Sequence, residues 1–286
     1  MSTYYKPSGI APVNSILTLA IGGGIAAVAL SIVYIALQWF IPIIYLNLLI
    51  TVGFGFGLYL ALAYLVKLGK IRNQGIAAGV ALFAALVGMY SQWALFISLM
   101  ERVDGNVLYF VKTSFSLDNY MAVFTDPLRL FSEAKILNDI GTFSIKSATV
   151  SGIVLWMVWI IEAAMIIGIP VYFTYIHAGN PFSEKNNTWM DESTFDVKLK
   201  YIEDTAAFKS AVESGDYAVI NNLVGNEAQD RFSSITGYRS EGDENMFLTF
   251  TNHLITTNKK GEAEEKKDTV VQYLRTDEGL LKQLVG

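Results

Sequence analysis

Residues 152–176 read GIVLWMVWIIEAAMIIGIPVYFTYI, an apolar run interrupted by a single acid, Glu162. A continuous apolar run of about 18 residues or more is typical of a membrane-spanning helix. Three similar runs precede it, at residues 14–40, 43–66 and 75–100. Glu162 is the only acidic or basic residue within any of these four runs. The pattern predicts an α-helical integral membrane protein with four transmembrane helices.

The composition agrees with this prediction and limits the kinds of partner that the chain is expected to bind. The chain is 52% hydrophobic and 16% charged, whereas soluble domains are roughly 25% charged. Of the 26 acidic residues 19 follow Ile176, against 12 of the 21 basic ones, so the C-terminal tail is acidic. Nucleic-acid binding needs clustered Lys and Arg, so we expect the lipid bilayer and no nucleic acid as a partner. The absence of cysteine excludes disulfides and thiolate chemistry.

The polar breaks divide the chain into domains. Residues 1–178 are predicted to form the four-span membrane domain, with a structured extracytoplasmic loop at residues 101–150. Gly179-Asn180-Pro181 ends the fourth helix, because Pro cannot continue it. Residues 179–190 are then expected to form a linker, and residues 191–286 a small soluble α+β cytoplasmic domain.

The loop between the third and fourth runs carries helix signals. Asp126 before Pro127 is typical of a helix start, and Gly141 lies where a C-terminal cap belongs. A second, shorter helix is predicted from about Ser116 to Phe124. These helices form either a lid over the span ends, or a surface that grips a partner or lies in the lipid interface.

The tail contains signals for both helices and strands. Helices are predicted at about residues 204–214 and 216–224, each closed by a glycine (Gly215, Gly225), and a short final helix at residues 277–284. Strands at residues 245–257 and 268–275 flank turn residues and predict a β-hairpin. The charged residues 262–268 are interpreted as a solvated loop edge, with a docking element as the alternative.

The loop charges predict the orientation. Lys67, Lys70 and Arg72 lie in the short turn between the second and third runs, which the positive-inside rule places in the cytoplasm. Both termini are then cytoplasmic, and residues 101–150 face outward. This organisation is typical of multi-pass proteins of the bacterial inner membrane.

Glu162 is the intramembrane residue that suggests a mechanism. It lies about ten residues into its run, which at ~1.5 Å per residue is about 15 Å deep, where a charged carboxylate costs roughly 2.5–3.5 kcal/mol. The same depth argument gives Ser91, Tyr90 and Ser31 as its candidate partners. Glu162 is interpreted either as an interhelical hydrogen-bonding group that fixes packing, or as a proton or cation site.

Small residues recur in the first three runs and predict close helix packing. Three separate helix faces carry small residues, which is more than one tight helix–helix contact within a monomer requires. A homo-oligomer or contact with other membrane subunits is therefore expected. The candidate packing residues are Gly22, Gly24, Gly53, Gly55, Gly57, Gly75 and Gly79.

Catalytic, metal and cofactor motifs are not recognised. The Gly53-Phe-Gly-Phe-Gly sequence lies within a span rather than between a strand and a helix, and the two histidines, His177 and His253, cannot make the usual zinc triad. We therefore expect no catalytic residue, no metal and no cofactor. The sequence favours a non-enzymatic subunit or adaptor of a membrane complex with a cytoplasmic docking domain. The alternatives are an ion-conducting or proton-linked protein that uses Glu162 and, third, a membrane enzyme.

Overall fold

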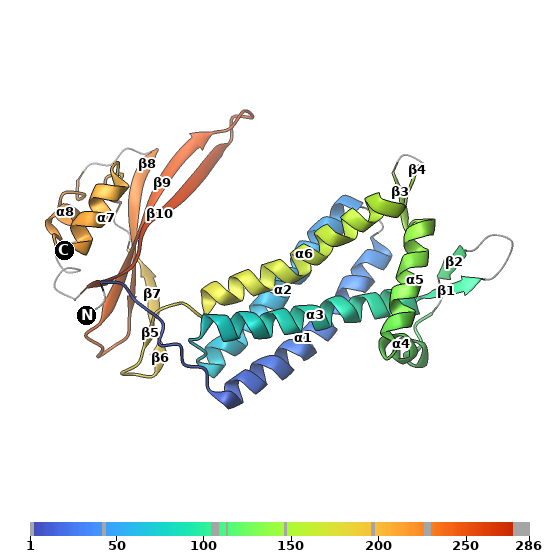
Figure 1. Ribbon diagram of the computed structural model, residues 1–286. Helices are drawn as coiled ribbons and strands as arrows, with labels where there is room; N and C mark the ends of the chain where they lie inside the picture. Colours follow the sequence, from blue (N-terminus) through green and yellow to red (C-terminus); the bar gives the residue numbers. More distant parts are fainter. Residues whose placement is uncertain are drawn as a thin grey trace. The chain divides into compact units, whose positions relative to one another are not determined.

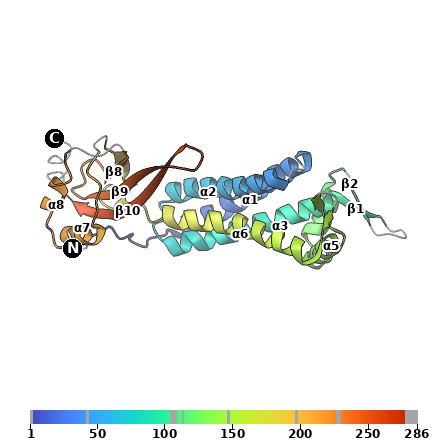
Figure 2. The same cartoon turned by 90° about the horizontal axis from the view of Figure 1, so that it is seen from above.

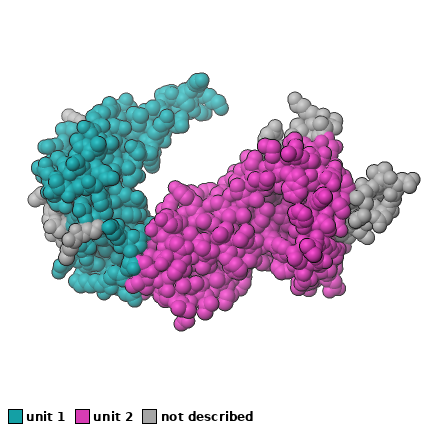
Figure 3. Space-filling model, in the orientation of Figure 1, with its two compact units in different colours: residues 1–8, 179–286 teal, residues 9–178 magenta. Residues whose placement is uncertain are grey.

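Four helices in the computed structural model of the chain are long and apolar enough to cross a membrane (Figure 1). The structure describes residues 3–41, 44–103, 109–112, 114–145, 148–195, 198–225 and 230–276. The four helices are α1 (Val13–Phe40), α2 (Ile44–Gly69), α3 (Gln74–Ser98) and α6 (Gly152–His177). The chain divides into two compact units, residues 9–178 and residues 1–8 with 179–286 (Figure 3).

The four long helices form a bundle in which α1 and α6 each pack against both α2 and α3. Gly88 of α3 allows a close approach of both α1 and α2, because a Cβ there would lie 2.9 Å from Phe54 Cζ and 3.3 Å from Ala27 Cβ. Helices satisfy their backbone hydrogen bonds internally, which spanning segments require. Apolar side chains fill the interior of the bundle, among them the fully buried Leu58, Leu62, Val66 and Ala81.

Helices α4 (Leu117–Phe124) and α5 (Pro127–Ile140) lie across the end of the bundle where α3 ends and α6 begins (Figures 1 and 2). The Asp126 side chain accepts hydrogen bonds from the amides of Leu128 and Arg129 and caps α5. Gly141 ends α5 at φ +90°, and a Cβ there would lie 2.4 Å from Thr149 Cγ2. The cap residues therefore predict both helices correctly. The sequence did not predict the short hairpins beside them, β1 (Met100–Val103) with β2 (Tyr109–Lys112) and β3 (Phe143–Ile145) with β4 (Ala148–Val150).

The unit formed by residues 1–8 and 179–286, called the soluble unit after its polar sequence, is built on an antiparallel sheet of order β10-β9-β8-β7. Helices α7 (Thr205–Glu213) and α8 (Ala218–Asn221) cover one face, where Phe208, Val212 and Ile220 pack against the sheet. A separate two-stranded hairpin, β5 (Phe182–Ser183) with β6 (Thr188–Trp189), lies within the predicted linker. The sheet strands are β7 (Asp191–Thr194), β8 (Arg231–Arg239), β9 (Met246–Thr257) and β10 (Ala263–Thr276).

Three expectations for the tail need revision. The predicted hairpin is present as β9 and β10, but it belongs to a four-stranded sheet whose strands β7 and β8 the sequence analysis missed. The charged residues 262–268 are exposed but mostly form the first part of strand β10 rather than a loop. Helix α8 is one turn long, shorter than the predicted 216–224. The predicted helix 277–284 lies outside the described residues.

The N-terminal segment belongs to the soluble unit. Tyr4 pairs antiparallel with Leu274, and two backbone hydrogen bonds flank this bridge, Tyr5 N to Tyr273 O at 2.9 Å and Arg275 N to Thr3 O at 2.8 Å. The Tyr5 ring lies edge-on to the rings of Phe247 and Tyr273. The first residues of the chain therefore extend the sheet beyond β10.

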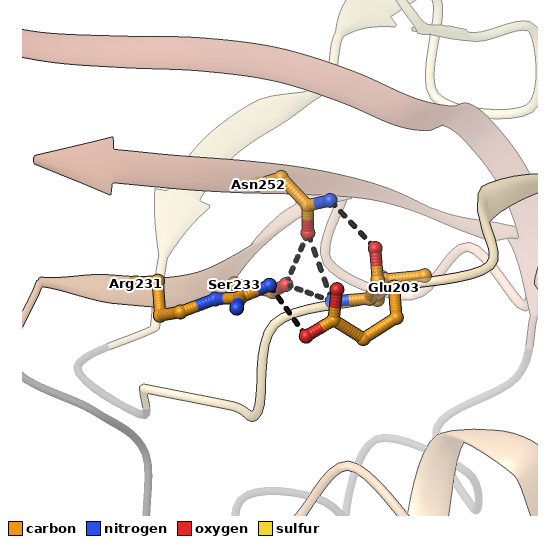
Figure 4. A network of polar contacts seen from close by, with 5 residues as sticks. Glu203, Arg231, Ser233 and Asn252 are labelled. Carbon is orange, nitrogen blue, oxygen red and sulfur yellow. Dashed lines mark hydrogen bonds and ion pairs between the residues drawn. The ribbon is translucent and has the colours of Figure 1, made fainter.

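A buried polar network attaches the segment before α7 to strands β8 and β9 (Figure 4). Asn252 Nδ2 donates to Ile202 O at 2.9 Å, and Asn252 Oδ1 accepts from Ile202 N at 3.2 Å and from Ser233 Oγ at 2.5 Å. Glu203 and Arg231 form an ion pair beside it. Because Asn252 and Ser233 are almost completely buried, these bonds fix the position of the segment on the sheet.

Candidate functional site

Glu162 lies on the face of α6 that packs against α2. It precedes Met165 and Ile169 by three and seven residues, so the three share one helix face. Gly55 of α2 lies against this face, because a Cβ there would be 3.0 Å from Ile169 Cβ and 3.0 Å from Met165 O. Glu162 itself is half-buried.

A polar pair from two other helices lies near the carboxyl group. Tyr34 Oη of α1 and Thr51 Oγ1 of α2 are 3.1 Å apart, and both residues are buried. Thr51 Oγ1 donates to Asn47 O at 2.9 Å, so the Tyr34 hydroxyl is the donor to Thr51. The Glu162 carboxyl is close enough to the Tyr34 hydroxyl for an electrostatic interaction. Tyr34, Thr51 and Glu162 together are called the midspan cluster.

The partners predicted for Glu162 bind elsewhere. Ser31 Oγ donates to Ala27 O at 2.8 Å and lies 3.0 Å from Gly88 O, where it faces α3. Tyr90 Oη donates to Phe124 O at 2.7 Å, and Ser91 Oγ lies 3.2 Å from Tyr120 Oη. Ser31 therefore joins α1 to α3, and Tyr90 and Ser91 join α3 to α4.

The sequence analysis missed Tyr34 and Thr51, although a signal was present. Tyr34 lies six residues before the end of α1 and Thr51 seven residues after the start of α2, which at ~1.5 Å per residue are about 9 and 10 Å from those helix ends. Both are hydroxyl-bearing residues in runs that contain few polar groups.

The midspan cluster places the hydrogen-bonded hydroxyl groups of Tyr34 and Thr51 within electrostatic range of one carboxyl group in the apolar bundle. A protonated carboxyl can donate a hydrogen bond there, whereas an ionised one needs donors or a cation. Beyond the cluster, toward the end of the bundle remote from α4 and α5, the interior is filled by fully buried apolar side chains such as Leu62 and Val66. The Glu162 carboxyl can therefore hold a proton at this depth.

The glycines fall into two groups. Gly22, Gly55 and Gly57 lie against neighbouring helices, since a Cβ at each would be within 3.3 Å of Leu65, Met165 with Ile169, or Leu30. Gly23 and Gly88, which were not among the predicted residues, are packed as closely. A Cβ on Gly24, Gly53 or Gly79 would meet no atom within 4 Å, and on Gly75 it would approach only Asn73 Oδ1, at 3.5 Å.

The soluble unit contains a second polar group on the sheet face opposite α7 and α8. His253 Nε2 lies 2.7 Å from Ser234 Oγ, and His253 Nδ1 lies 2.6 Å from Glu265 Oε1. Phe232 stacks on the imidazole with a centroid distance of 4.7 Å. The hydrogen bond from His253 holds the pKa of the Glu265 carboxyl below its ordinary value. The sequence placed His253 in a strand but could not supply these partners.

These distances are those of a nucleophile, base and acid, but acyl transfer also needs preorganised donors for the oxyanion. Ser234 lies within the β8–β9 ladder opposite Thr251, and the preceding amide, Ser233 N, donates to Leu199 O at 2.9 Å. The group is therefore better suited to joining strands β8, β9 and β10. In the part of the chain that the structure describes, no three His, Asp or Glu side chains are grouped to hold a metal ion.

Together the fold and the site define a protein with four potential membrane-spanning helices and a C-terminal sheet region of α+β character. The chain matches no protein-family model, and neither a curated protein nor a solved structure is found to be similar to it.

Proposed function

We propose that the chain is a non-enzymatic subunit or adaptor of a membrane complex in the bacterial inner membrane. In this proposal the soluble unit is a cytoplasmic docking domain, and α5 carries a contact surface on the other side. The observation that carries the proposal is the exposed apolar face of α5.

Helix α5 has two apolar faces. Ala134 and Leu137 are buried against the bundle, whereas Leu128 and Phe131 are 82% and 62% exposed. Leu128 and Phe131 are three residues apart and therefore adjacent on one side of the helix. Exposed apolar patches that have no structural role in the monomer mark interaction sites, which supports a protein partner at this position.

A photocrosslinking amino acid at Phe131, with Asp139 as an exposed polar control on the same helix, tests this contact in cells. We expect a discrete protein adduct at position 131 and none at 139, and Leu128→Ser with Phe131→Ser should abolish the complex without lowering thermal stability. Lipid adducts alone at position 131 would count against the proposal.

Two observations support the proposed orientation. Lys67 lies in the last turn of α2 and Lys70 directly follows this helix. The N-terminal segment pairs with β10, which supports the proposal that both termini lie on one side of the membrane. A reporter after Gly286 should therefore be cytoplasmic, and one inserted near Asn106 should face outward. Labelling of Lys260→Cys from the periplasm would contradict this topology.

Self-association is the second part of the partner proposal. Gly75 and Gly79 are exposed on α3 one turn apart, so another helix could approach closely there. Gly79→Leu should reduce the mass of the purified protein measured by light scattering, whereas Gly24→Leu should not. If Gly79→Leu leaves the mass unchanged, self-association through this face of α3 is contradicted. Contact with other membrane subunits then remains as the expectation.

A proton-linked or ion-conducting protein is the second candidate function, and the midspan cluster favours it. Glu162→Gln keeps the shape and most hydrogen bonds of the side chain but removes its titratable proton. If Glu162 only fixes packing, the Gln variant should resemble the wild type and Glu162→Leu should lose about 1 kcal/mol of bundle stability. If Glu162 binds the transported ion, the Gln variant should fold normally but lose proton-dependent flux in liposomes.

A further inference from the structure

A groove of about 560 Å³ lies between α1, α3 and the start of α4. Its walls include Ile32, Ala36 and Phe40 of α1, Leu95 of α3, and Phe115 with Leu117 at the start of α4. Its volume is in the range of ~300–1,000 Å³ that is typical of ligand sites.

The chemistry of the walls favours hydrocarbon. Ser91 and Tyr120 also line the groove, but their hydroxyl groups are 3.2 Å apart and hydrogen-bond to each other. These two hydroxyl groups are therefore satisfied without a ligand, which leaves Ser114 and Trp39 as the other lining residues with a polar group. A polar molecule would find few free partners in this groove, whereas an aliphatic chain needs none.

The groove opens onto the surface that faces lipid in a membrane. Ile32 and Phe40, which border it, are 55% and 82% exposed and lie on a helix apolar enough to span the bilayer. Lipid tails surround such a surface, and no hydrophobic drive acts between apolar groups there. Van der Waals contacts between apolar groups still stabilise packing in lipid, and the walls of an unfilled groove lack these contacts. A chain that fits the groove therefore binds better than one on a flat helix face.

We propose that this groove binds one acyl chain of a bilayer phospholipid, enclosed by Phe115 and Leu117. The bound lipid would connect the start of α4 to α1, since Phe115 and Leu117 form the α4 side of the groove and Ala36 and Phe40 form the α1 side. This site is independent of the α5 surface, because neither Leu128 nor Phe131 lines the groove.

Ala36 and Ala29 provide a matched pair of variants. Both are exposed on α1 and lie seven residues, about two turns, apart, but only Ala36 lines the groove. Ala36→Phe should fill the groove without disturbing the interior of the bundle, whereas Ala29→Phe adds the same bulk outside it. Comparison of the two variants separates loss of the groove from a general effect of a larger side chain.

Native mass spectrometry of the full chain, purified from liposomes of palmitoyl-oleoyl phosphatidylglycerol into detergent, measures the retained lipid. We expect the wild type and Ala29→Phe to retain one phospholipid per chain and Ala36→Phe to retain none, with equal thermal stability of the two variants. Equal retention by all three proteins would overturn the proposal.

The wild type alone also tests the proposal if Ala36→Phe fails to fold. Complete loss of phospholipid from the wild type under conditions that leave the chain folded would contradict it. Retention of an isoprenoid lipid instead of phospholipid from a native membrane extract, or dimerisation that buries the groove, would contradict it as well.

Discussion

The Tyr5 amide donates a 2.9 Å hydrogen bond to the Tyr273 carbonyl, which joins the first residues of the chain to the last described strand of the soluble unit. Tyr4 also contacts the apolar core of this unit, and its hydroxyl donates to Glu213 at 2.9 Å. The soluble unit is therefore completed by residues that precede the first long helix.

Deletion of residues 2–5 should destabilise the soluble unit. The deletion removes two backbone hydrogen bonds and the contacts of Tyr4 and Tyr5, and the bonds alone are worth about 2 kcal/mol. Hydrogen exchange of the full chain in detergent should show faster exchange at residues 271–275. Tyr4→Phe is the control, because it keeps the strand and loses only the exposed bond to Glu213. Unchanged exchange after the deletion would mean that the strand contributes no stability.

Gly88→Ala should destabilise the bundle. The new methyl group would meet Phe54 Cζ at 2.9 Å and Ala27 Cβ at 3.3 Å, and overpacking of this kind costs about 1–3 kcal/mol. Gly53→Ala is the matched control, since no atom lies within 4 Å of its Cβ position; it should be neutral or stabilising by up to about 1 kcal/mol. Thermal unfolding in detergent measures both, and equal behaviour would contradict the packing described for α1, α2 and α3.

Asn252→Ala should unfold the soluble unit more easily. The change leaves the Ile202 carbonyl and the Ser233 hydroxyl proton without their partner, and it leaves the Ile202 amide only a 3.3 Å bond to Ser233 Oγ. Buried polar groups left in this state cost roughly 3 kcal/mol in total. Thr251→Ala, on the opposite face of the same strand, should cost less than about 1 kcal/mol. Urea unfolding followed by far-ultraviolet circular dichroism compares the two, and similar losses would argue against the network as the cause.

Glu265 should make the stability of the soluble unit depend on acid pH. Its pKa is lowered from 4.5 in the folded chain, chiefly by the hydrogen bond with His253. A carboxyl whose pKa is depressed on folding stabilises the fold above its unfolded pKa, and this contribution is lost as pH falls through the folded pKa. The stability advantage of the wild type over Glu265→Gln should therefore be present at neutral pH and shrink below pH 4.5.

Glu264→Gln is the control for this dependence, because successive side chains on a strand point to opposite faces. It should leave the acid dependence of the wild type unchanged. If wild type and Glu265→Gln lose stability in parallel down to the end of the titration, the bond between His253 and Glu265 has no energetic role.

The sequence by itself determined the elements whose causes are local. Each long apolar run predicts its own helix, because backbone groups in hydrocarbon must bond within the segment. Helices α4 and α5 follow from cap residues such as Ser116 and Asp126, which satisfy neighbouring amides. Strands β9 and β10 follow from their composition and from the turn residues between them.

Only the tertiary structure decided what depends on residues distant in the chain. The pairing of Tyr4 with Leu274 and the grouping of Ser234, His253 and Glu265 require a particular strand order and register, which no single segment specifies. The approach of Tyr34 and Thr51 to Glu162 depends in the same way on which helices are neighbours and on how each is rotated. The position of a residue along its apolar run sets its depth in the span. The packing of whole helices decides which neighbouring helix the residue faces. For this reason the predicted partners of Glu162 were found in other contacts.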